Sequence, residues 1–356
     1  MRKTVIMDKI RVGLVGITGY TGMELARLLA SHPHMELTMG CSRSEAGRRL
    51  GEFYPFLEGL PGADVVISTY APEAVARQCD LVFLAVPHGK AMVMAQELYD
   101  LGLKVVDLSA DFRIHDAAVY EAWYKVPHTQ KELLPAAVYG LPEFYAKDIA
   151  QARLVANPGC YPTSALLGLA PALTNGLVHT EDIVIDSKSG TSGAGRKAVT
   201  TSLFCEVADS FRAYGLGRHR HTPEIEQELS LLAGTPVTVS FNTHLVPMNR
   251  GILSTIYTKR ARRASLDEVW QIYRDFYKKH PFVRVCPKGN LPETRFVRGS
   301  LFCDMGLVVD ERTDRLIIVS VIDNICRGAS GQALANANLM CGLPMSEGLA
   351  QAPLLP

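Results

Sequence analysis

The sequence lacks the features that mark several specialised classes of protein. Its net charge is only +1, so no excess of one sign points to a nucleic acid or a membrane surface as a partner. The eight cysteines form no C-x-x-C pair, which indicates neither a zinc site nor a disulfide framework. No apolar run is long enough to span a bilayer, and residues 1–9 have no apolar core of signal-peptide length. We therefore expect a cytoplasmic protein, in a reducing environment and without a metal ion.

The composition is that of an ordinary globular enzyme. Hydrophobic residues make up 47% of the chain and charged residues 21%, and no internal repeat or low-complexity segment occurs. A length of 356 residues exceeds what one hydrophobic core usually supports, so we expect two domains.

The segment from Asn157 to Thr163, Asn-Pro-Gly-Cys-Tyr-Pro-Thr, is the most informative part of the sequence. A short apolar strand over residues 154–156 leads into a Pro-Gly turn, and apolar residues at helical spacing follow. Pro162 suits the first turn of a helix, where its missing N–H is not needed. Cys160 would therefore lie where backbone N–H groups and the helix dipole favour a nucleophilic thiolate. The alternative is a buried structural cysteine.

The N-terminal part of the chain contains a dinucleotide-binding pattern. A strand over residues 10–16 is followed by a helix over residues 23–29. Starting within the strand, Gly13-x-x-Gly16-x-x-Gly19 is a variant of the glycine fingerprint that lets backbone amides approach a pyrophosphate. Because strand, glycine turn and helix follow in the required order, we predict a Rossmann-type domain. A tight turn without a ligand is the alternative.

The end of the second strand, over residues 35–39, indicates which dinucleotide binds. An NAD site usually has an acidic residue here for the ribose 2′-hydroxyl. Ser42 and Arg43 come first instead and suit a 2′-phosphate, so we predict NADP. Glu45 lies near enough to keep NAD open, and Arg43 could instead be a solvated surface charge.

Two further apolar strands deliver polar residues to the carboxyl edge of the expected parallel sheet, where ligands bind. One strand ends in Pro87 and His88. The other ends just before Ser109 and Arg113, which could hold a phosphate or a carboxylate. An arginine at the surface, paired with Asp111, explains Arg113 equally well.

The second half of the chain has a different pattern. A strand over residues 183–186 leads into a Gly/Ser-rich loop over residues 187–196, whose N–H groups could wrap a cofactor or an anion. A flexible surface loop is the alternative. Longer strands over residues 236–246 and 251–258 are predicted to be antiparallel partners, joined by residues 247–250. Because helices lie mostly apart from these strands, we expect an α+β domain with a mainly antiparallel sheet.

Two histidines and two arginines cluster at residues 218–221, directly before Thr-Pro-Glu. His219 and His221 are candidates for acid–base chemistry, and the arginines for anion binding. Histidines two residues apart are poor support for a metal site. The alternative is a solvated basic turn.

Taken together, these motifs resemble the N-acetyl-gamma-glutamyl-phosphate reductase family, within the aspartate-semialdehyde-dehydrogenase-like superfamily. The resemblance is carried along nearly the whole chain by Thr18–Gly22, Leu108–Arg113, Asn157–Thr163, Ser189–Arg196, His219–Glu224, His244–Gly251 and Asp323-Asn324. One departure is Cys326-Arg327, where an apolar residue and a lysine would be expected before the glycine. That departure bears on a cofactor contact and not on the family.

The resemblance implies an α/β enzyme that reduces N-acetyl-L-glutamyl 5-phosphate to N-acetyl-L-glutamate 5-semialdehyde with NADPH, in arginine biosynthesis. It implies a Rossmann-type NADP-binding domain over residues 1–157 and 328–356, completed by the C-terminal helix. A catalytic and oligomerisation domain would span residues 158–327, and the protein would form a homodimer or homotetramer.

The resemblance also implies roles for individual residues. Cys160 would attack the acyl phosphate to form a thioester, which accepts a hydride better than a carboxylate does. His219 is the first choice for the proton shuttle and His221 the second, and the sequence does not separate them. Substrate would be bound by Ser109, Arg113, Asn157 and Tyr214. The cofactor would be bound by Gly13, Gly16, Thr18, Gly19, Tyr20, Thr21, Gly22, Ser42, Arg43, Pro87, His88, Ser189, Gly190, Gly193 and Asn324.

Three other functions stay open. The aminoadipyl-phosphate analogue in lysine biosynthesis would share nearly every motif, because discrimination of one methylene is worth only ~1–3 kcal/mol. Aspartate-semialdehyde dehydrogenase should place its histidine and arginine differently from the run His219–Glu224. A non-catalytic NADP-sensing protein would have no need of Cys160 at a helix N-terminus.

Overall fold

A computed structural model describes residues 9–355, which fold into two compact units. The first unit runs to His115 and resumes over Pro127–Asn157 and Ser330–Ala350. The second comprises Asp116–Val126, Pro158–Ala329 and the chain from Gln351. Residues 116–126, 328–329 and 351–355 thus lie outside the unit to which the sequence assigned them. Most of the segment considered above for a signal peptide lies outside the described residues.

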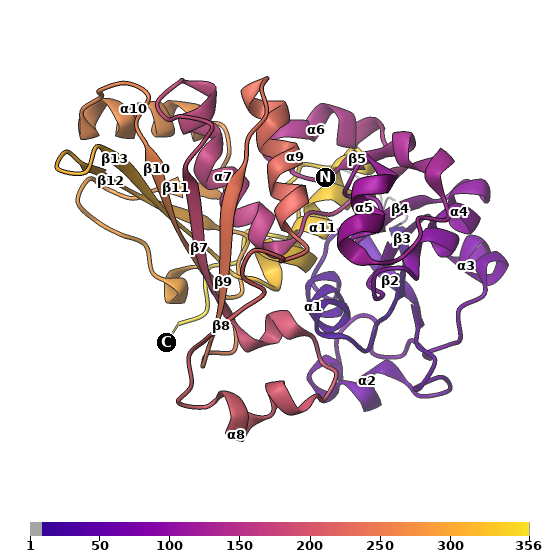
Figure 1. Cartoon of the computed structure of the whole chain (residues 1–356). Coiled ribbons are helices and arrows are strands. Elements are labelled where there is room, and N and C mark those ends of the chain that lie inside the picture. Colours follow the sequence, from indigo (N-terminus) through magenta and orange to yellow (C-terminus); the bar gives the residue numbers. More distant parts are fainter. Residues whose placement is uncertain (1–8, 356) are drawn as a thin grey trace, which may run out of the picture. The chain divides into compact units, whose positions relative to one another are not determined.

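The first unit is built on a parallel sheet with the strand order β2-β1-β3-β4-β6-β5 (Figure 1). Its strands over residues 81–84 and 154–156 are buried along their whole length, as in sheets covered by helices on both faces, and they therefore read as continuous apolar runs. The strands are β1 (Ile10–Val15), β2 (Met35–Cys41), β3 (Leu81–Leu84), β4 (Lys104–Asp107), β5 (Ala137–Tyr139) and β6 (Leu154–Ala156). This is the predicted Rossmann-type arrangement.

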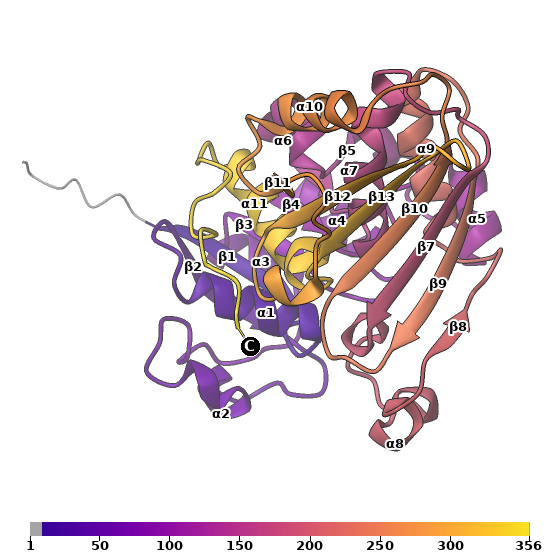
Figure 2. The ribbon, with the colours of Figure 1, turned by 90° about the vertical axis from the view of Figure 1, so that its left-hand side faces the viewer.

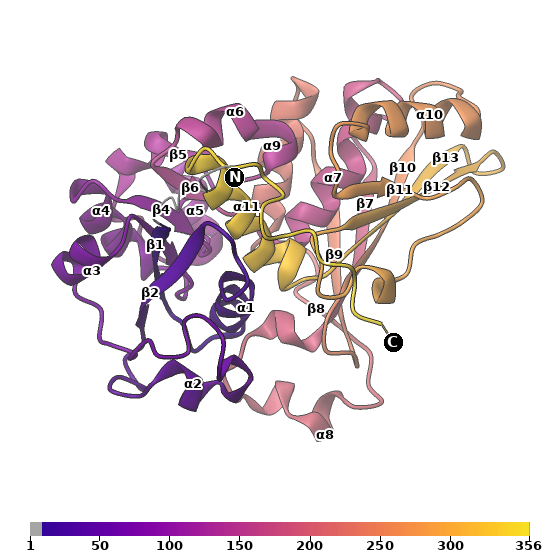
Figure 3. The same ribbon diagram turned by 180° about the vertical axis from the view of Figure 1, so that it is seen from behind.

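The helices of the first unit include one from the far end of the chain. Helix α11 (Gly331–Met340) contacts α1 (Tyr20–Leu29), α6 (Pro142–Gln151) and β4 (Figure 3). Its buried Asn336 donates from Nδ2 to the carbonyl of Gly140 at 2.8 Å, which ties the C-terminal helix to the loop after β5. The remaining helices are α2 (Leu50–Phe53), α3 (Pro72–Gln78) and α4 (Ala91–Asp100).

The second unit contains a mixed sheet with the order β11-β12-β13-β10-β7-β9-β8 (Figure 2). Strands β7 and β9, and β11 and β12, run parallel, whereas the other neighbours run antiparallel. The mainly antiparallel sheet is as predicted. Its strands are β7 (Ile183–Gly190), β8 (Arg212–Tyr214), β9 (Val239–Val246), β10 (Ile252–Lys259), β11 (Val283–Val285), β12 (Cys303–Asp310) and β13 (Arg315–Ile322).

The predicted pairing of β9 with β10 is wrong, because β7 lies between them. Strand β7 continues to Gly190, past the residue where the sequence pattern ended it. The segment between β9 and β10 crosses over the end of β7, and the N–H groups of Thr191 and Ser192 donate to the carbonyls of Met248 and Asn249. A connection of five residues, 247–251, thus spans an intervening strand instead of closing a hairpin.

Helix α7 (Cys160–Thr174) forms the centre of the second unit. It contacts β10 and β13 of the sheet as well as α9 (Thr222–Ala233) and α10 (Leu266–Tyr277). Every residue from Tyr161 to Leu173 is buried, so the helix is enclosed on all sides instead of burying the single face that its spacing predicted. The unit also includes α5 (Ala117–Tyr124) and α8 (Phe204–Val207). Among residues 9–355, no helix has the length and apolar character needed to cross a membrane.

Candidate active site

Cys160 is the first residue of α7, as the sequence predicted. Gly159 is the N-cap, with an extended backbone (φ −67°, ψ 155°) and without a side-chain cap. Cys160 is partly exposed, whereas the residues on either side of it are buried. The thiol thus lies at a helix end whose N–H groups and dipole favour its ionised form.

A buried carboxylate that the sequence analysis missed lies at the same helix end. The N–H of Gly159 donates to Oε1 of Glu224 at 2.8 Å, and Glu224 is fully buried. Glu224 lies in the first turn of α9, whose N-cap is His221. One carboxylate thus connects the turn before Cys160 with the start of the histidine-bearing helix. Its position three residues after the N-cap is a recognisable sequence signal.

His219 and His221 lie together in a group of aromatic rings. The ring of His219 lies 5.0 Å from that of His221, 5.3 Å from that of Tyr161 and 5.1 Å from that of Phe241. The backbone N–H of His221 donates to Nδ1 of His219 at 3.1 Å. Burial, with a smaller effect of the Arg220 charge, lowers the pKa of His219 to about 4. His219 is therefore neutral at neutral pH and carries its proton on Nε2.

Tyr214, a predicted substrate-binding residue, joins this group. Its hydroxyl lies 2.6 Å from that of Tyr161, and its ring lies 5.8 Å from that of His219. Its carbonyl accepts a hydrogen bond from the Thr243 hydroxyl at 2.5 Å. Burial raises the pKa of Tyr161, so both hydroxyls are protonated at neutral pH and one donates to the other.

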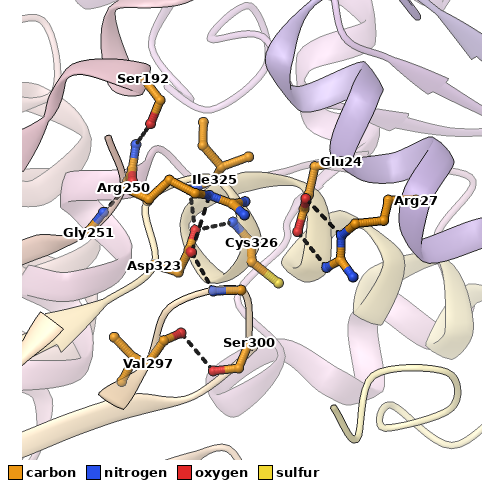
Figure 4. A network of polar contacts seen from close by, with 12 residues as sticks. Glu24, Arg27, Ser192, Arg250, Gly251, Val297, Ser300, Asp323, Ile325 and Cys326 are labelled. Carbon is orange, nitrogen blue, oxygen red and sulfur yellow. Dashed lines mark hydrogen bonds and ion pairs between the residues drawn. The ribbon is translucent and has the colours of Figure 1, made fainter. Parts of the chain in front are cut away.

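A buried polar network connects the end of β13 with two loops (Figure 4). Asn324 accepts from the N–H of Gly251 at 2.7 Å through Oδ1 and donates to the Ser192 hydroxyl at 3.0 Å through Nδ2. Asp323 accepts from the N–H groups of Ile325 and Cys326 at 2.8 and 2.7 Å through Oδ1. The structure thus brings predicted Asn324 to the Gly/Ser-rich segment.

Three other predicted cofactor residues lie on that segment, but not all in a loop. Ser189 is buried and Gly190 is the last residue of β7, so both belong to a strand. A side chain at Gly190 would approach the carbonyl of Asn249 to 2.8 Å. Exposed Gly193 lies in the short helical turn that follows, where its Cβ position is 3.6 Å from Nδ2 of Asn324.

The predicted dinucleotide turn lies between β1 and α1. Gly16 has a positive φ of +89°, and a Cβ there would lie 2.2 Å from the carbonyl oxygen of Ala85. A Cβ at Gly22 would lie 2.5 Å from the carbonyl oxygen of Gly16, and one at Gly13 would lie 2.9 Å from Sγ of Cys79. The close approach of backbone to backbone therefore requires glycine at Gly16 and Gly22, whereas at Gly13 the conflict is with a side chain.

The residues around this turn are held by hydrogen bonds. Gly19 is the N-cap of α1, and its N–H donates to the carbonyl of Gly16 at 3.2 Å. Tyr20 begins α1, and the carbonyl of Thr21 accepts from the Ser330 hydroxyl at 2.9 Å. The Thr18 hydroxyl lies 3.4 Å from the Ser42 hydroxyl, which places predicted Ser42 beside the turn.

Arg43 is exposed directly after β2, in the position that the NADP prediction requires. Glu45, the residue that kept NAD open, forms an ion pair of 2.7 Å with Arg48. A carboxylate engaged with its own cation is a poorer partner for a ribose hydroxyl, which favours the phosphorylated cofactor.

The loops after β3 and β4 are tied together. Pro87 is exposed and His88 is partly buried between β3 and α4. Asp111 accepts from the N–H groups of Gly89 and Ala91 at 2.7 and 3.0 Å, so it holds this loop.

The predicted phosphate-binding residues are buried at the end of β4. The Ser109 hydroxyl donates to Oδ2 of Asp107 at 2.8 Å, and burial together with the Asp111 charge raises the pKa of Asp107. Arg113 is only 7% exposed and donates from Nε to the carbonyl of Asn157 at 2.7 Å. The Asn157 side chain in turn accepts from Asn336 at 3.0 Å. Asn157 and Arg113 thus fix the segment that leads to Cys160.

No group of three or more metal-ligating side chains is found within the described part of the chain.

Comparisons with known proteins agree on the family. The model of the semialdehyde dehydrogenase NAD-binding domain matches residues 11–152, and that of the semialdehyde dehydrogenase dimerisation domain matches residues 160–324. The N-acetyl-gamma-glutamyl-phosphate reductase of Geobacter sp. (strain M21) is 52% identical over 348 residues, which cover 98% of this chain and 100% of that protein. The enzymes of the same name from Geotalea daltonii and Pelotomaculum thermopropionicum are 53% and 50% identical, over 98% of this chain and 100% and 99% of theirs.

Solved structures share the fold at low sequence identity. Aspartate semialdehyde dehydrogenase II from Vibrio cholerae has a TM-score of 0.72 at 16% identity, over 94% of this chain and 99% of its own. The aspartate semialdehyde dehydrogenase of Candida albicans, solved with NADP, has a TM-score of 0.64 at 18% identity, over 94% and 99%.

Proposed function

Because this chain belongs to the N-acetyl-gamma-glutamyl-phosphate reductase family, we propose that it reduces N-acetyl-L-glutamyl 5-phosphate to N-acetyl-L-glutamate 5-semialdehyde with NADPH, in arginine biosynthesis. The observation that carries this proposal is the position of Cys160 at the start of α7, beside the turn held by Glu224. It is joined by the 52% sequence identity of this chain to a reductase of that name. The enzyme is an oxidoreductase that acts on an acyl phosphate.

The glycine turn fits a dinucleotide, because the backbone packs so closely at Gly16 and Gly22 that only glycine permits this tight turn before a helix N-terminus. We propose that the backbone N–H groups of the glycine turn hold the pyrophosphate and that Ser42 and Arg43 hold the 2′-phosphate. When bound, NADPH supplies the hydride that reduces the acyl group. The other residues proposed to contact it are Gly13, Thr18, Gly19, Tyr20, Thr21, Pro87, His88, Ser189, Gly190, Gly193 and Asn324.

Cys160 performs the covalent chemistry in this proposal. Its thiolate attacks the acyl carbonyl carbon, the bond from that carbon to the phosphate oxygen breaks, and phosphate leaves with the bonding electrons. A thioester on Cys160 remains. After reduction the carbon–sulfur bond breaks, the aldehyde is released, and the thiolate is regenerated.

His219 and His221 handle the protons, and hydrogen bonding supports different roles for them. Since Nδ1 of His219 accepts the N–H of His221, the neutral ring can donate from Nε2 without changing tautomer. A neutral imidazole of low pKa is suited to stabilise an oxygen that gains negative charge. We therefore assign His219 to the substrate oxygen and His221 to the thiol proton.

The remaining proposed substrate contacts are polar residues, of which Ser109, Arg113 and Asn157 are buried and Tyr214 is exposed. Ser109 and Arg113 are proposed to bind the phosphate, which is supported by their place at the carboxyl end of β4. Tyr214 is proposed to contact the substrate from its position beside His219. Asn157 is proposed to act through the backbone before Cys160, because its side chain is 1% exposed.

The match to a dimerisation domain supports self-association. Along β10, Ile252, Ser254 and Ile256 are buried, whereas the alternating residues Leu253, Thr255 and Tyr257 are only partly covered. A half-covered sheet face suits contact with a second copy, and we propose a homodimer or homotetramer. We also propose a cytoplasmic location. All eight cysteines lie among the described residues and are free thiols, which suits a reducing compartment.

The proposal is tested by running the reaction in reverse. Purified protein is given NADP, phosphate and either N-acetyl-L-glutamate 5-semialdehyde or its homologue with one more methylene. We expect phosphate-dependent NADP reduction with the shorter aldehyde. Preference for the longer aldehyde would move the enzyme to lysine biosynthesis, and activity with neither would favour a protein that only binds NADP.

A further inference from the structure

Gly328 lies against the nucleophile. A Cβ at Gly328 would be 2.6 Å from Cβ of Cys160 and 3.0 Å from its Cα, which is closer than two such atoms can approach. Gly328 is buried and its φ lies outside the left-handed region, so backbone conformation does not explain the glycine. Cys160 occupies the space that a side chain at residue 328 would fill.

An unusual backbone segment carries Gly328. Residues Cys326–Ser330 form a single π-helical turn, a rare structure that is frequent at functional sites. The N–H of Gly328, in the middle of the turn, donates to the carbonyl of Asp323 at 2.9 Å. This hydrogen bond fixes the turn to a residue that lies three positions before its start.

The Asp323 carboxylate fixes the start of the same turn (Figure 4). It is fully buried, and its Oδ1 accepts from the N–H groups of Ile325 and Cys326. Its Oδ2 accepts from the N–H of Gly299 at 2.6 Å and lies 3.3 Å from Nε of Arg250. Because backbone N–H groups occupy both oxygens, the carboxylate serves to hold the backbone in place.

We propose that Gly328 and Asp323 are positioning residues for Cys160: Asp323 holds the π-helical turn, and the turn presses the bare Gly328 backbone against the nucleophile and sets its place at the end of α7. Neither residue takes part in bond making. The expected change in kcat rests on the proposed function. The expected change in the reactivity of the Cys160 thiol rests only on the geometry.

The chain offers a matched control for Gly328. Gly306 is also buried, also lies outside the left-handed region, and its Cβ would lie 2.7 Å from Cδ of Pro292 and 2.8 Å from Cδ2 of Leu291. Gly328→Ala and Gly306→Ala thus introduce similar crowding in the same unit, but only the first crowds Cys160. Asp304→Asn is the control for Asp323→Asn, since Asp304 is a buried carboxylate paired with Arg284.

The experiment measures alkylation of Cys160 by iodoacetamide against pH, resolved by peptide mass, together with kcat and KM. We expect Gly328→Ala and Asp323→Asn to shift the pH at which Cys160 reacts upward, and to lower kcat by about 100-fold, as for a displacement near 1 Å, with little change in KM. Gly306→Ala and Asp304→Asn should lose stability but keep the alkylation profile.

Two outcomes would overturn the inference. One is a folded Gly328→Ala protein whose alkylation profile and kcat match those of Gly306→Ala. The other is a folded Asp323→Asn protein that matches Asp304→Asn, should Gly328→Ala fail to fold. Alkylation requires no substrate, so loss of the expected shift contradicts the positioning role, whereas absent reductase activity in the wild type contradicts the proposed function alone.

Discussion

Helices α1 and α7 begin in nearly the same way. Each has a glycine N-cap with extended backbone, Gly19 at φ −79° and ψ 169° and Gly159 at φ −67° and ψ 155°, and neither is capped by a side chain. Both helix ends therefore present backbone N–H groups and the positive end of a dipole. The first favours a phosphate brought by a ligand, and the second favours a thiolate that the chain itself supplies.

What surrounds the two helix ends differs. At α1, the helix end is open, because a Cβ at Gly19 would have only the carbonyl oxygen of Gly16 within 4 Å, at 3.6 Å. At α7, the space is filled by the protein: Gly328 abuts Cys160 and Glu224 accepts from Gly159. The comparison teaches that a helix end with a glycine N-cap serves ligand binding when it is left open. The same kind of helix end serves catalysis when the protein packs around a nucleophile there.

The largest effect should come from removing the nucleophile. Cys160→Ser is expected to abolish turnover, because serine is not ionised at the helix end, and to leave NADPH affinity unchanged. Turnover and fluorescence titration with NADPH check the two halves. Lost cofactor binding in this variant would show that the two helix ends do not work separately.

His219→Gln is expected to lower kcat by about 10²–10³-fold, as for loss of one donor to a developing oxyanion. His221→Gln serves as the comparison and should instead slow alkylation of Cys160 by iodoacetamide at neutral pH. Steady-state kinetics and the alkylation rate distinguish the two histidines. Slowed alkylation in His219→Gln alone would reverse their roles.

The neutral ring of His219 should also make stability depend on pH. Its pKa of about 4 in the folded chain lies below the value of 6.5 expected for an unfolded histidine. Between these values the unfolded chain binds more protons, so stability is full above pH 6.5 and falls as pH falls toward 4. The contribution is on the order of 3 kcal/mol. Denaturant unfolding across this range should show a smaller decrease for His219→Gln than for the wild type.

At α1, the decisive change is a methyl group in the glycine turn. Gly16→Ala should weaken NADPH binding by about 10- to 100-fold, since strain of this kind amounts to ~1–3 kcal/mol. Gly47→Ala is the control, because Gly47 has a similar φ of +91° but nothing within 4 Å of its Cβ position. Equal NADPH affinities in the two variants would contradict the role of the turn.

The smallest effect should come from the exposed Arg43. Arg43→Ala is expected to weaken NADPH binding by about fivefold, as for a surface ion pair near 1 kcal/mol, and to leave NADH binding unchanged. Titration with both cofactors measures this. Arg48→Ala, which removes the cation paired with Glu45, is the control. An equal loss for NADH would remove the basis for assigning a 2′-phosphate site.

Both helix ends could be predicted from the sequence because their signals are local. Gly16, Gly19 and Gly22 follow a strand within a few residues, and Cys160 follows one after a turn of three residues. The pairing of β9 with β10 was predicted wrongly, since the position of β7 between them depends on contacts distant in the sequence.

The supports of the nucleophile could not be predicted for the same reason. Glu224 contacts Gly159 from 65 residues away in the sequence. Gly328 contacts Cys160 because it lies in a π-helical turn, which no residue spacing in the sequence predicts. Sequence patterns identify the reacting group, but the groups that hold it are brought together only by the fold.

The most direct test of the account is the covalent intermediate. The wild-type protein is mixed with N-acetyl-L-glutamyl 5-phosphate without NADPH, and its intact mass and peptides are measured. The account predicts one acyl group on Cys160, with release of phosphate, and its loss as aldehyde when NADPH is added. Full turnover with no acyl group on Cys160 at any time, or with the acyl group on another residue, would contradict it.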